Sequence, residues 1–214
     1  MNFLKITTAA LALTMTLAIG NTANAQKMAK KEKTVMVGGA PMYPSKNIVE
    51  NAVNSKDHTT LVAAVKAAGL VETLQSKGPF TVFAPTNAAF EKLPAGTVET
   101  LVMPENKETL TKILTYHVVP GRISSKDLMA WIKKNGGKYM AKTVQGEELT
   151  FWMKGMNLYV KDTKGNSAKI TTADVNQSNG VIHVIDTVLM PQFHSFIFIG
   201  AASIPFVVAL FLYS

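Results

Sequence analysis

Two short apolar runs constrain most strongly what this chain can fold into. The first spans residues 78–90 with the sequence GPFTVFAPTNAAF, and the second spans residues 179–191 with the sequence NGVIHVIDTVLMP. Each begins at a turn that contains glycine, continues as a short apolar segment, and reaches a proline, which cannot donate a ladder hydrogen bond. Uninterrupted apolar segments of this kind are typical of strands buried near the centre of a fold. The two runs therefore predict one domain that they frame.

The residues around these runs predict a helical front half and a β-rich second half. Apolar residues at helical spacing predict helices over residues 47–54, 59–68, 71–74, 87–90 and 106–116. Thr59 or Thr60 is placed to cap the second of these helices, and Asn87 to cap the fourth. Glycine-containing turns predict antiparallel hairpins built from residues 139–144, 148–153, 158–161 and 168–172. The expected fold class is α+β, with N-terminal helices packed on a mostly antiparallel β-wedge or sandwich.

The N-terminal end has the pattern of an export signal followed by a basic arm. A short positive start, an apolar run and the A-x-A motif of residues 23–25 predict a cleaved signal peptide over residues 1–25. Residues 26–43 are then expected to be a lysine-rich arm and a linker. Pro41 and Pro44 disfavour regular structure and mark residues 40–46 as the linker into the fold. We expect an exported protein that is periplasmic, extracellular or held at the cell surface.

The C-terminal residues 193–214 form an apolar tail. Residues 196–213 carry no charge and would make roughly 27 Å of helix, enough to span a bilayer. Pro205 near the middle and the lack of any Lys or Arg after Lys169 are atypical of an anchor. Three interpretations stay open: a membrane tether, a buried or partner-docking tail, and a segment foreign to the natural domain.

Charge and cysteine content narrow the classes of partner. The formal net charge is +8 at pH 7, yet Arg122 is the only arginine. Because bidentate recognition of phosphates and bases depends mainly on arginine, no specific nucleic-acid partner is expected. Lysines favour a diffuse attraction to anionic surfaces such as acidic polysaccharide. The chain contains no cysteine, which excludes disulfides and thiolate metal sites.

Catalytic signatures are missing from the sequence. Neither a G-x-S-x-G elbow, an H-E-x-x-H pair, a P-loop nor a dinucleotide fingerprint occurs. Ser124, His117 and Asp186 have the residue types of a catalytic triad, but a chain of this length offers such a set by chance. The loop at residues 162–166 lacks the closing acid of a calcium site. We expect no enzyme activity, no cofactor and no metal.

Together with residues 115–121, TYHVVPG, the two apolar runs resemble the homology boxes and the Tyr-His motif of the fasciclin (FAS1) domain family. The resemblance implies a single FAS1 domain over residues 44–192. Asn87 departs from the family, which usually has aspartate there, although asparagine caps helices about as well. The box residues, which we expect to be mainly structural, are Thr81, Phe83, Ala84, Pro85, Thr86, Asn87, Phe90, Gly180, His183 and Asp186.

The fasciclin family consists mainly of extracellular adhesion modules, so the resemblance implies a non-enzymatic role in adhesion or matrix contact. In animal relatives the Tyr-His pair is associated with binding cell-surface receptors. Tyr116 and His117 are therefore the candidate adhesion motif, within a binding face near residues 116–122. The alternative is that both side chains hold a helix–strand junction by packing and hydrogen bonds.

Two further histidines are assigned from their neighbours. His183 lies among apolar residues and is expected to be a core histidine with hydrogen-bond partners, whereas His58 is expected at the surface.

The expected binding partner of the protein is a polysaccharide or protein of the cell surface or matrix, with membrane contact if the tail is a tether. The alternative function is a periplasmic protein that binds a small hydrophobic ligand or cofactor in an apolar cleft between helices and sheet.

Overall fold

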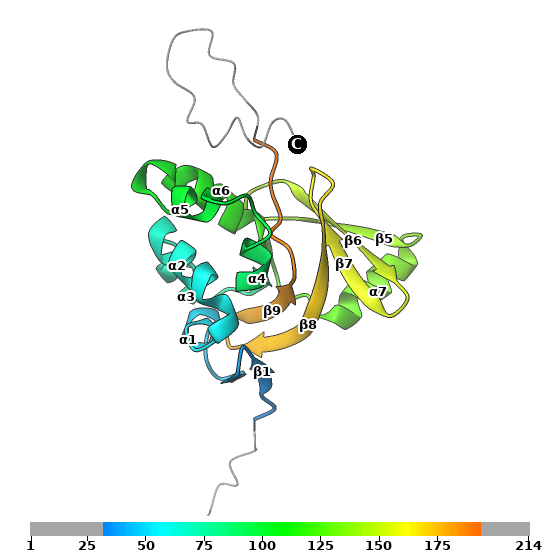
Figure 1. Ribbon diagram of the computed structural model, residues 1–214. Helices are drawn as coiled ribbons and strands as arrows, with labels where there is room; N and C mark the ends of the chain where they lie inside the picture. Colours follow the sequence, from blue (N-terminus) through cyan, green and yellow to red (C-terminus); the bar gives the residue numbers. More distant parts are fainter. Residues whose placement is uncertain (1–31, 194–214) are drawn as a thin grey trace, which may run out of the picture. The chain divides into compact units, whose positions relative to one another are not determined.

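The computed structural model describes residues 32–193, and Figure 1 shows how their helices and strands are arranged. The predicted signal peptide, the start of the basic arm and all but the first residue of the apolar tail lie outside the described residues. Within residues 32–193, no helix is both long and apolar enough to cross a bilayer.

Seven strands form one sheet in the order β4-β3-β9-β8-β7-β6-β5. Only β3 and β9 run parallel among these neighbours, and the other pairs are antiparallel. The two apolar runs therefore supply adjacent strands inside the sheet, as the sequence predicted. The strands are β3 (Phe80–Pro85), β4 (Val118–Pro120), β5 (Lys138–Lys142), β6 (Glu148–Lys154), β7 (Asn157–Lys161), β8 (Ser167–Gln177) and β9 (Gly180–Ile185).

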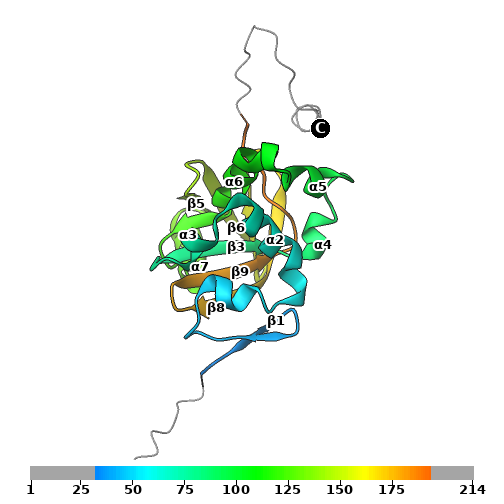
Figure 2. The same cartoon turned by 90° about the vertical axis from the view of Figure 1, so that its left-hand side faces the viewer.

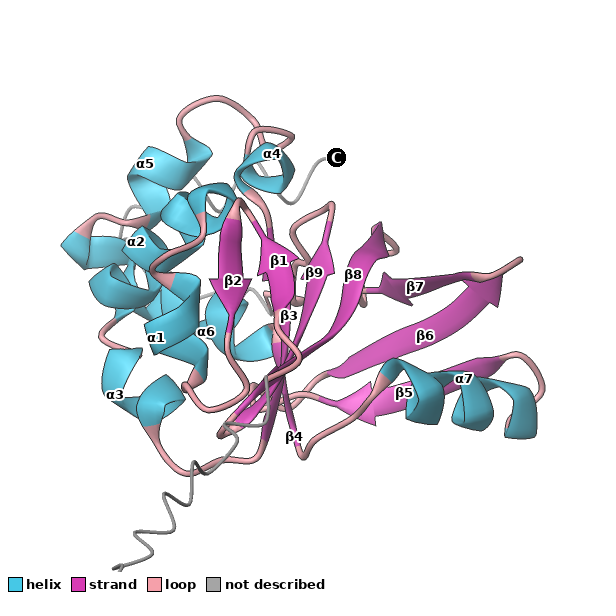
Figure 3. Ribbon diagram, turned by 90° about the horizontal axis from the view of Figure 1, so that it is seen from below, coloured by secondary structure: helices cyan, strands magenta, loops and turns pink. Residues whose placement is uncertain are grey.

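Helices α1–α6 gather beside β3 and β9, whereas α7 lies against β5 and β6 (Figures 2 and 3). The α+β class is confirmed, with N-terminal helices on a mostly antiparallel sheet. The helices are α1 (Ile48–Ala52), α2 (Thr59–Ala68), α3 (Val71–Gln75), α4 (Asn87–Phe90), α5 (Thr97–Leu101), α6 (Lys107–Tyr116) and α7 (Ser125–Lys134), with 3-10 turns at Lys56–His58 and Pro104–Asn106.

The central strands separate two hydrophobic cores. Because successive side chains of a strand point to opposite faces, Val82 and Ala84 of β3 pack into the helical core built with α1–α6. Phe83 points the other way, into a second core that includes Leu128 of α7 and Phe151 of β6. Strands β3 and β9 are thus buried on both faces, which explains their continuous apolar sequences.

One contact ties β8 to the start of α7, and another ties the segment after edge strand β5 to edge strand β4. Strand β8 is bulged, and Asp174 at the bulge has a φ of 58°. Its carboxylate accepts the N–H of Ser125 at 2.7 Å, where α7 begins. The residue Val144, after β5, donates its N–H to the carbonyl of Val118 in β4 at 2.7 Å. The outer strands therefore curl back towards the central ones.

The N-terminal linker predicted from Pro41 and Pro44 is in part a hairpin, so that prediction was wrong for residues 35–42. Strands β1 (Val35–Val37) and β2 (Ala40–Met42) pair across a turn in which Gly38 and Gly39 have φ values of 57° and 76°. Met42 is buried in the helical core. Pro41 is tolerated because a two-stranded hairpin leaves one side of each strand unpaired.

Helix α7 was not predicted, although its start carries a readable signal. Ser124 and Asp127 form a capping box, in which each side chain accepts the backbone N–H of the other residue. The short helix α5, which begins after Gly96, also escaped prediction.

Candidate functional site

The box residues meet along the β3–β9 pair, inside the domain. Phe83 is fully buried, and its ring centroid lies 5.2 Å from that of Phe151 and 5.5 Å from that of His183. Thr81 is also fully buried, and its Oγ1 accepts the N–H of Ile123 at 2.9 Å. These contacts tie the central strands to the segment before α7 and to the second core.

Asn87 does not cap the helix that it begins, which corrects the prediction from the sequence. The cap of α4 is Thr86, whose Oγ1 accepts a backbone N–H of the first turn at 3.3 Å. The Asn87 side chain reaches the start of α2, where Oδ1 accepts the N–H of Thr60 at 3.0 Å and Nδ2 donates to the carbonyl of Lys56 at 2.9 Å. Thr59 and Thr60 lie within α2 and do not cap it themselves.

The other box residues are buried or bonded to the backbone. At Gly180, a Cβ atom would lie 2.2 Å from the carbonyl oxygen of Phe80, so a larger residue requires the two strands to move apart. Asp186 follows β9, and its Oδ1 accepts the N–H of Lys169 at 2.8 Å. The buried members of the first box also include Ala84, Pro85 and Phe90.

Tyr116 and His117, the candidate adhesion motif, are buried. Their side chains are 0 % and 3 % exposed, so no partner surface can touch them in this conformation. The Tyr116 hydroxyl donates to the carbonyl of Glu148 at 3.1 Å and accepts the N–H of Thr163 at 3.0 Å. The pair therefore joins the end of α6 to the outer strands by packing and hydrogen bonds.

His117 and His183 are both neutral, and in opposite tautomers. Nδ1 of His117 donates to the carbonyl of Ile113 at 2.8 Å, while Nε2 accepts the N–H of Leu189 at 3.0 Å. Nε2 of His183 donates to a carbonyl at 2.9 Å, and Nδ1 accepts the N–H of Asp174 at 3.3 Å. Burial lowers the pKa of His117 to about 4 and also lowers the pKa of His183. The prediction that His183 is a core histidine with partners is confirmed.

The binding face expected near residues 116–122 is not exposed as a unit. Residues 116–119 are buried. The Arg122 guanidinium donates to the carbonyls of Gly180 at 2.5 Å and Gln177 at 2.8 Å. The single arginine thus stabilises the β8–β9 turn through hydrogen bonds to backbone carbonyls.

Ser124, His117 and Asp186 do not form a catalytic triad in the structure. Ser124 is bonded to Asp127, and Asp186 to the backbone of the β8 strand, while both nitrogens of His117 contact other backbone groups. In the loop at residues 162–166, the buried Asp162 carboxylate accepts the N–H of Asn166 at 2.7 Å. Among residues 32–193 no group of three or more acidic or histidine side chains is placed to hold a metal ion.

The outer strands carry a face with exposed and partly exposed side chains, which was not predicted from the sequence. Directly paired positions place Lys138 of β5, Trp152 of β6, Tyr159 of β7 and Lys169 of β8 in one row across the sheet. The two aromatic rings stack with centroids 5.4 Å apart and planes 18° from parallel. The row therefore presents a flat aromatic pair with a lysine at each end.

Other positions on the same face add positive charge. In strands β5–β8 the alternate side chains that point away from the second core include a single acid, Glu148. The lysines that point outward are Lys138, Lys142, Lys154, Lys161 and Lys169. We call these lysines, together with Trp152 and Tyr159, the outer face. The alternation of lysine and apolar residues in β5 and β7 was the available signal, since it marks strands with one solvated side.

Comparison with known proteins agrees with this geometry. The fasciclin domain family model matches residues 56–191. Protein sll1483 of Synechocystis sp. is 50 % identical over 165 residues, which cover 77 % of this chain and 84 % of that protein. Immunogenic protein MPB70 of Mycobacterium bovis is 41 % identical over 145 residues, covering 65 % of this chain and 66 % of MPB70.

A solved structure shares the fold. A FAS1 domain pair from the insect cell adhesion molecule Fasciclin I superposes with a TM-score of 0.62 at 18 % sequence identity, covering 69 % of this chain and 52 % of the pair. The family is associated with adhesion and extracellular proteins. The family match over residues 56–191 and the 50 % identity to protein sll1483 show that this chain belongs to the fasciclin domain family.

Proposed function

We propose that this protein is an exported, non-enzymatic adhesion or matrix-contact module of the cell envelope, and that it binds acidic polysaccharide through the outer face. The observation that carries the proposal is the row from Lys138 to Lys169 across four strands, with Trp152 and Tyr159 stacked between them. Membrane contact through residues 193–214 would add a tether to this module.

The chemistry of the row suits a charged sugar chain. Aromatic rings offer an apolar surface for the faces of sugar rings, and lysines attract carboxylate or sulfate groups without demanding one geometry. Because the residues sit on paired strands, their spacing is fixed before binding, which reduces the entropy lost on association. Repeated weak sites on a polymer would then raise the overall avidity.

The test compares binding of the full chain to alginate, an acidic polysaccharide, and to dextran, a neutral one. We expect saturable binding to alginate that weakens as salt rises, because the attraction between exposed charges is screened. The variant Trp152→Ala with Lys161→Glu should lose most of this binding while retaining a cooperative thermal transition.

A matched control changes a lysine elsewhere on the surface. Lys112→Glu alters an exposed residue of α6 by the same charge and should leave alginate binding nearly unchanged. Equal losses in the two variants would mean that net charge alone attracts the polymer, and the outer face would lose its assigned role.

A further inference from the structure

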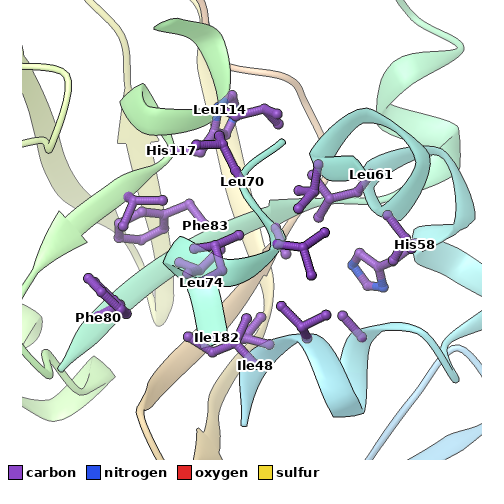
Figure 4. Close-up of a pocket in the computed structure, with 18 of the residues that line it drawn as sticks. Ile48, His58, Leu61, Leu70, Leu74, Phe80, Phe83, Leu114, His117 and Ile182 are labelled. Carbon is purple, nitrogen blue, oxygen red and sulfur yellow. The ribbon is translucent and has the colours of Figure 1, made fainter. Parts of the chain in front are cut away.

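An apolar cavity lies between the helices and the central strands. Its volume is about 90 Å³, several times the roughly 10–15 Å³ that one water needs. Figure 4 shows Ile48, Leu61, Leu74 and Ile182 around it. The lining also includes the exposed residues Lys66 and Thr73, so the cavity reaches the surface.

His58 is a polar group in this apolar lining. The sequence placed it at the surface, which was wrong, because only 3 % of the residue is exposed. The ring extends from the 3-10 turn before α2 towards the cavity, opposite Phe80 (Figure 4). Burial in the domain follows from the contacts of that turn with α2 and α4.

One nitrogen of His58 has a partner and the other has none. Nδ1 lies 2.9 Å from Oγ of Ser55. Among residues 32–193, Nε2 of His58 is the one buried side-chain nitrogen or oxygen without a hydrogen bond of good geometry, although the nearby Ala84 backbone partly offsets the lowering of the ring's pKa by burial. A buried polar atom left unpaired destabilises the folded state, and native proteins rarely keep one.

We propose that this cavity binds a small apolar molecule carrying one hydroxyl group, and that the hydroxyl pairs with Nε2 of His58. The lining supplies the apolar contact, and the imidazole supplies one oriented polar contact, which is the usual composition of a small-molecule site. A hydroxyl fits whichever tautomer Ser55 selects, since it both donates and accepts a hydrogen bond. This site is separate from the outer face and does not depend on the proposed adhesion.

The test uses two probes of matched shape, 4-ethylphenol and 4-ethyltoluene, which differ by a hydroxyl in place of a methyl group. The full chain, labelled with ¹⁵N in its histidines, is titrated with each probe. We expect 4-ethylphenol to bind saturably at one site and to shift the Nε2 resonance of His58, while that of His183 stays in place. A failure of both probes to bind saturably would overturn the proposal.

The variant His58→Phe isolates the polar contact, because it keeps a ring of similar size and removes the nitrogens. The affinity of 4-ethylphenol relative to 4-ethyltoluene should fall by about fivefold or more, the size expected for one hydrogen bond. Trp152→Ala on the outer face should leave this ratio unchanged. Saturable binding with an unmoved Nε2 resonance in the wild-type chain would also refute the pairing, even if the His58 variant did not fold.

Discussion

The central strands and the outer strands of the sheet differ in how many faces they bury. In β9 every residue from Gly180 to Ile185 is buried, because the strand lies between two cores. In β7 burial alternates, with Leu158 and Val160 inward and lysine or tyrosine outward. A strand enclosed on both sides has no side chain to offer a partner, whereas a strand enclosed on one side does. The motifs that identify the family therefore lie where contact is least available, and the residues free to bind lie elsewhere.

The largest expected difference between the two regions is in tolerance of aromatic truncation. Phe83→Ala should lower the free energy of unfolding by about 3–5 kcal/mol, because it empties a fully buried site between Phe151 and His183. Trp152→Ala, on the outer face, should cost no more than about 1 kcal/mol. Chemical denaturation of both variants measures the difference, and equal losses would contradict the one-sided burial of the outer strands.

A second difference should appear on acidification, which acts on the buried histidines and hardly on the outer face. The folded pKa of His117 is about 4, below its ordinary value of 6.5, so the unfolded chain binds more protons between these values. The free energy of unfolding should thus be fully retained above pH 6.5 and decrease by on the order of 3 kcal/mol as the pH falls to 4.

His117→Asn tests the source of this pH dependence. The variant cannot titrate in this range, so its unfolding free energy should fall less steeply between pH 6.5 and 4. Since burial also lowers the pKa of His58 and His183, part of the slope should remain. A slope identical to that of the wild-type chain would show that burial does not hold His117 neutral in the folded state.

A smaller loss of stability is expected when the hydrogen bonds between Asn87 of α4 and the start of α2 are removed. Asn87→Ala removes the acceptor for the Thr60 N–H and the donor to Lys56, and should cost about 1–2 kcal/mol. The matched control is Asn54→Ala, whose side chain is exposed and donates only to the carbonyl of Glu50, so its cost should stay below about 0.5 kcal/mol. If thermal denaturation shows the same loss of stability in both variants, Asn87 does not cap α2.

The sequence predicted most of the regular elements because their signals are local. The helix expected at residues 106–116 is α6, and the four predicted hairpin segments are β5 to β8 with ends that differ by a few residues. The hairpin of β1 and β2 was misassigned because proline is read as a breaker without knowledge of which strand edge is free.

The candidate site was harder to predict than the fold. Tyr116 and His117 could be named from the family motif, but their exposure depends on what α6 packs against. The outer face depends on register, since Trp152 and Tyr159 become neighbours only when β6 and β7 pair at those positions. Sequence spacing alone gave no reason to group them with Lys138 and Lys169.

By itself, the sequence determined the α+β class, the two apolar strands at the centre and the family, because apolar periodicity and turn residues act over a few neighbouring positions. Apart from His183, whose apolar neighbours predicted its burial, only the tertiary structure decided which polar side chains are internal. Asn87 accepts the N–H of Thr60, 27 residues earlier, and Asn179 accepts the N–H of Ile48 from 131 residues away. His58 became part of a cavity lining in the same way. Such partners are brought together by the packing of the two cores, so no local pattern records them.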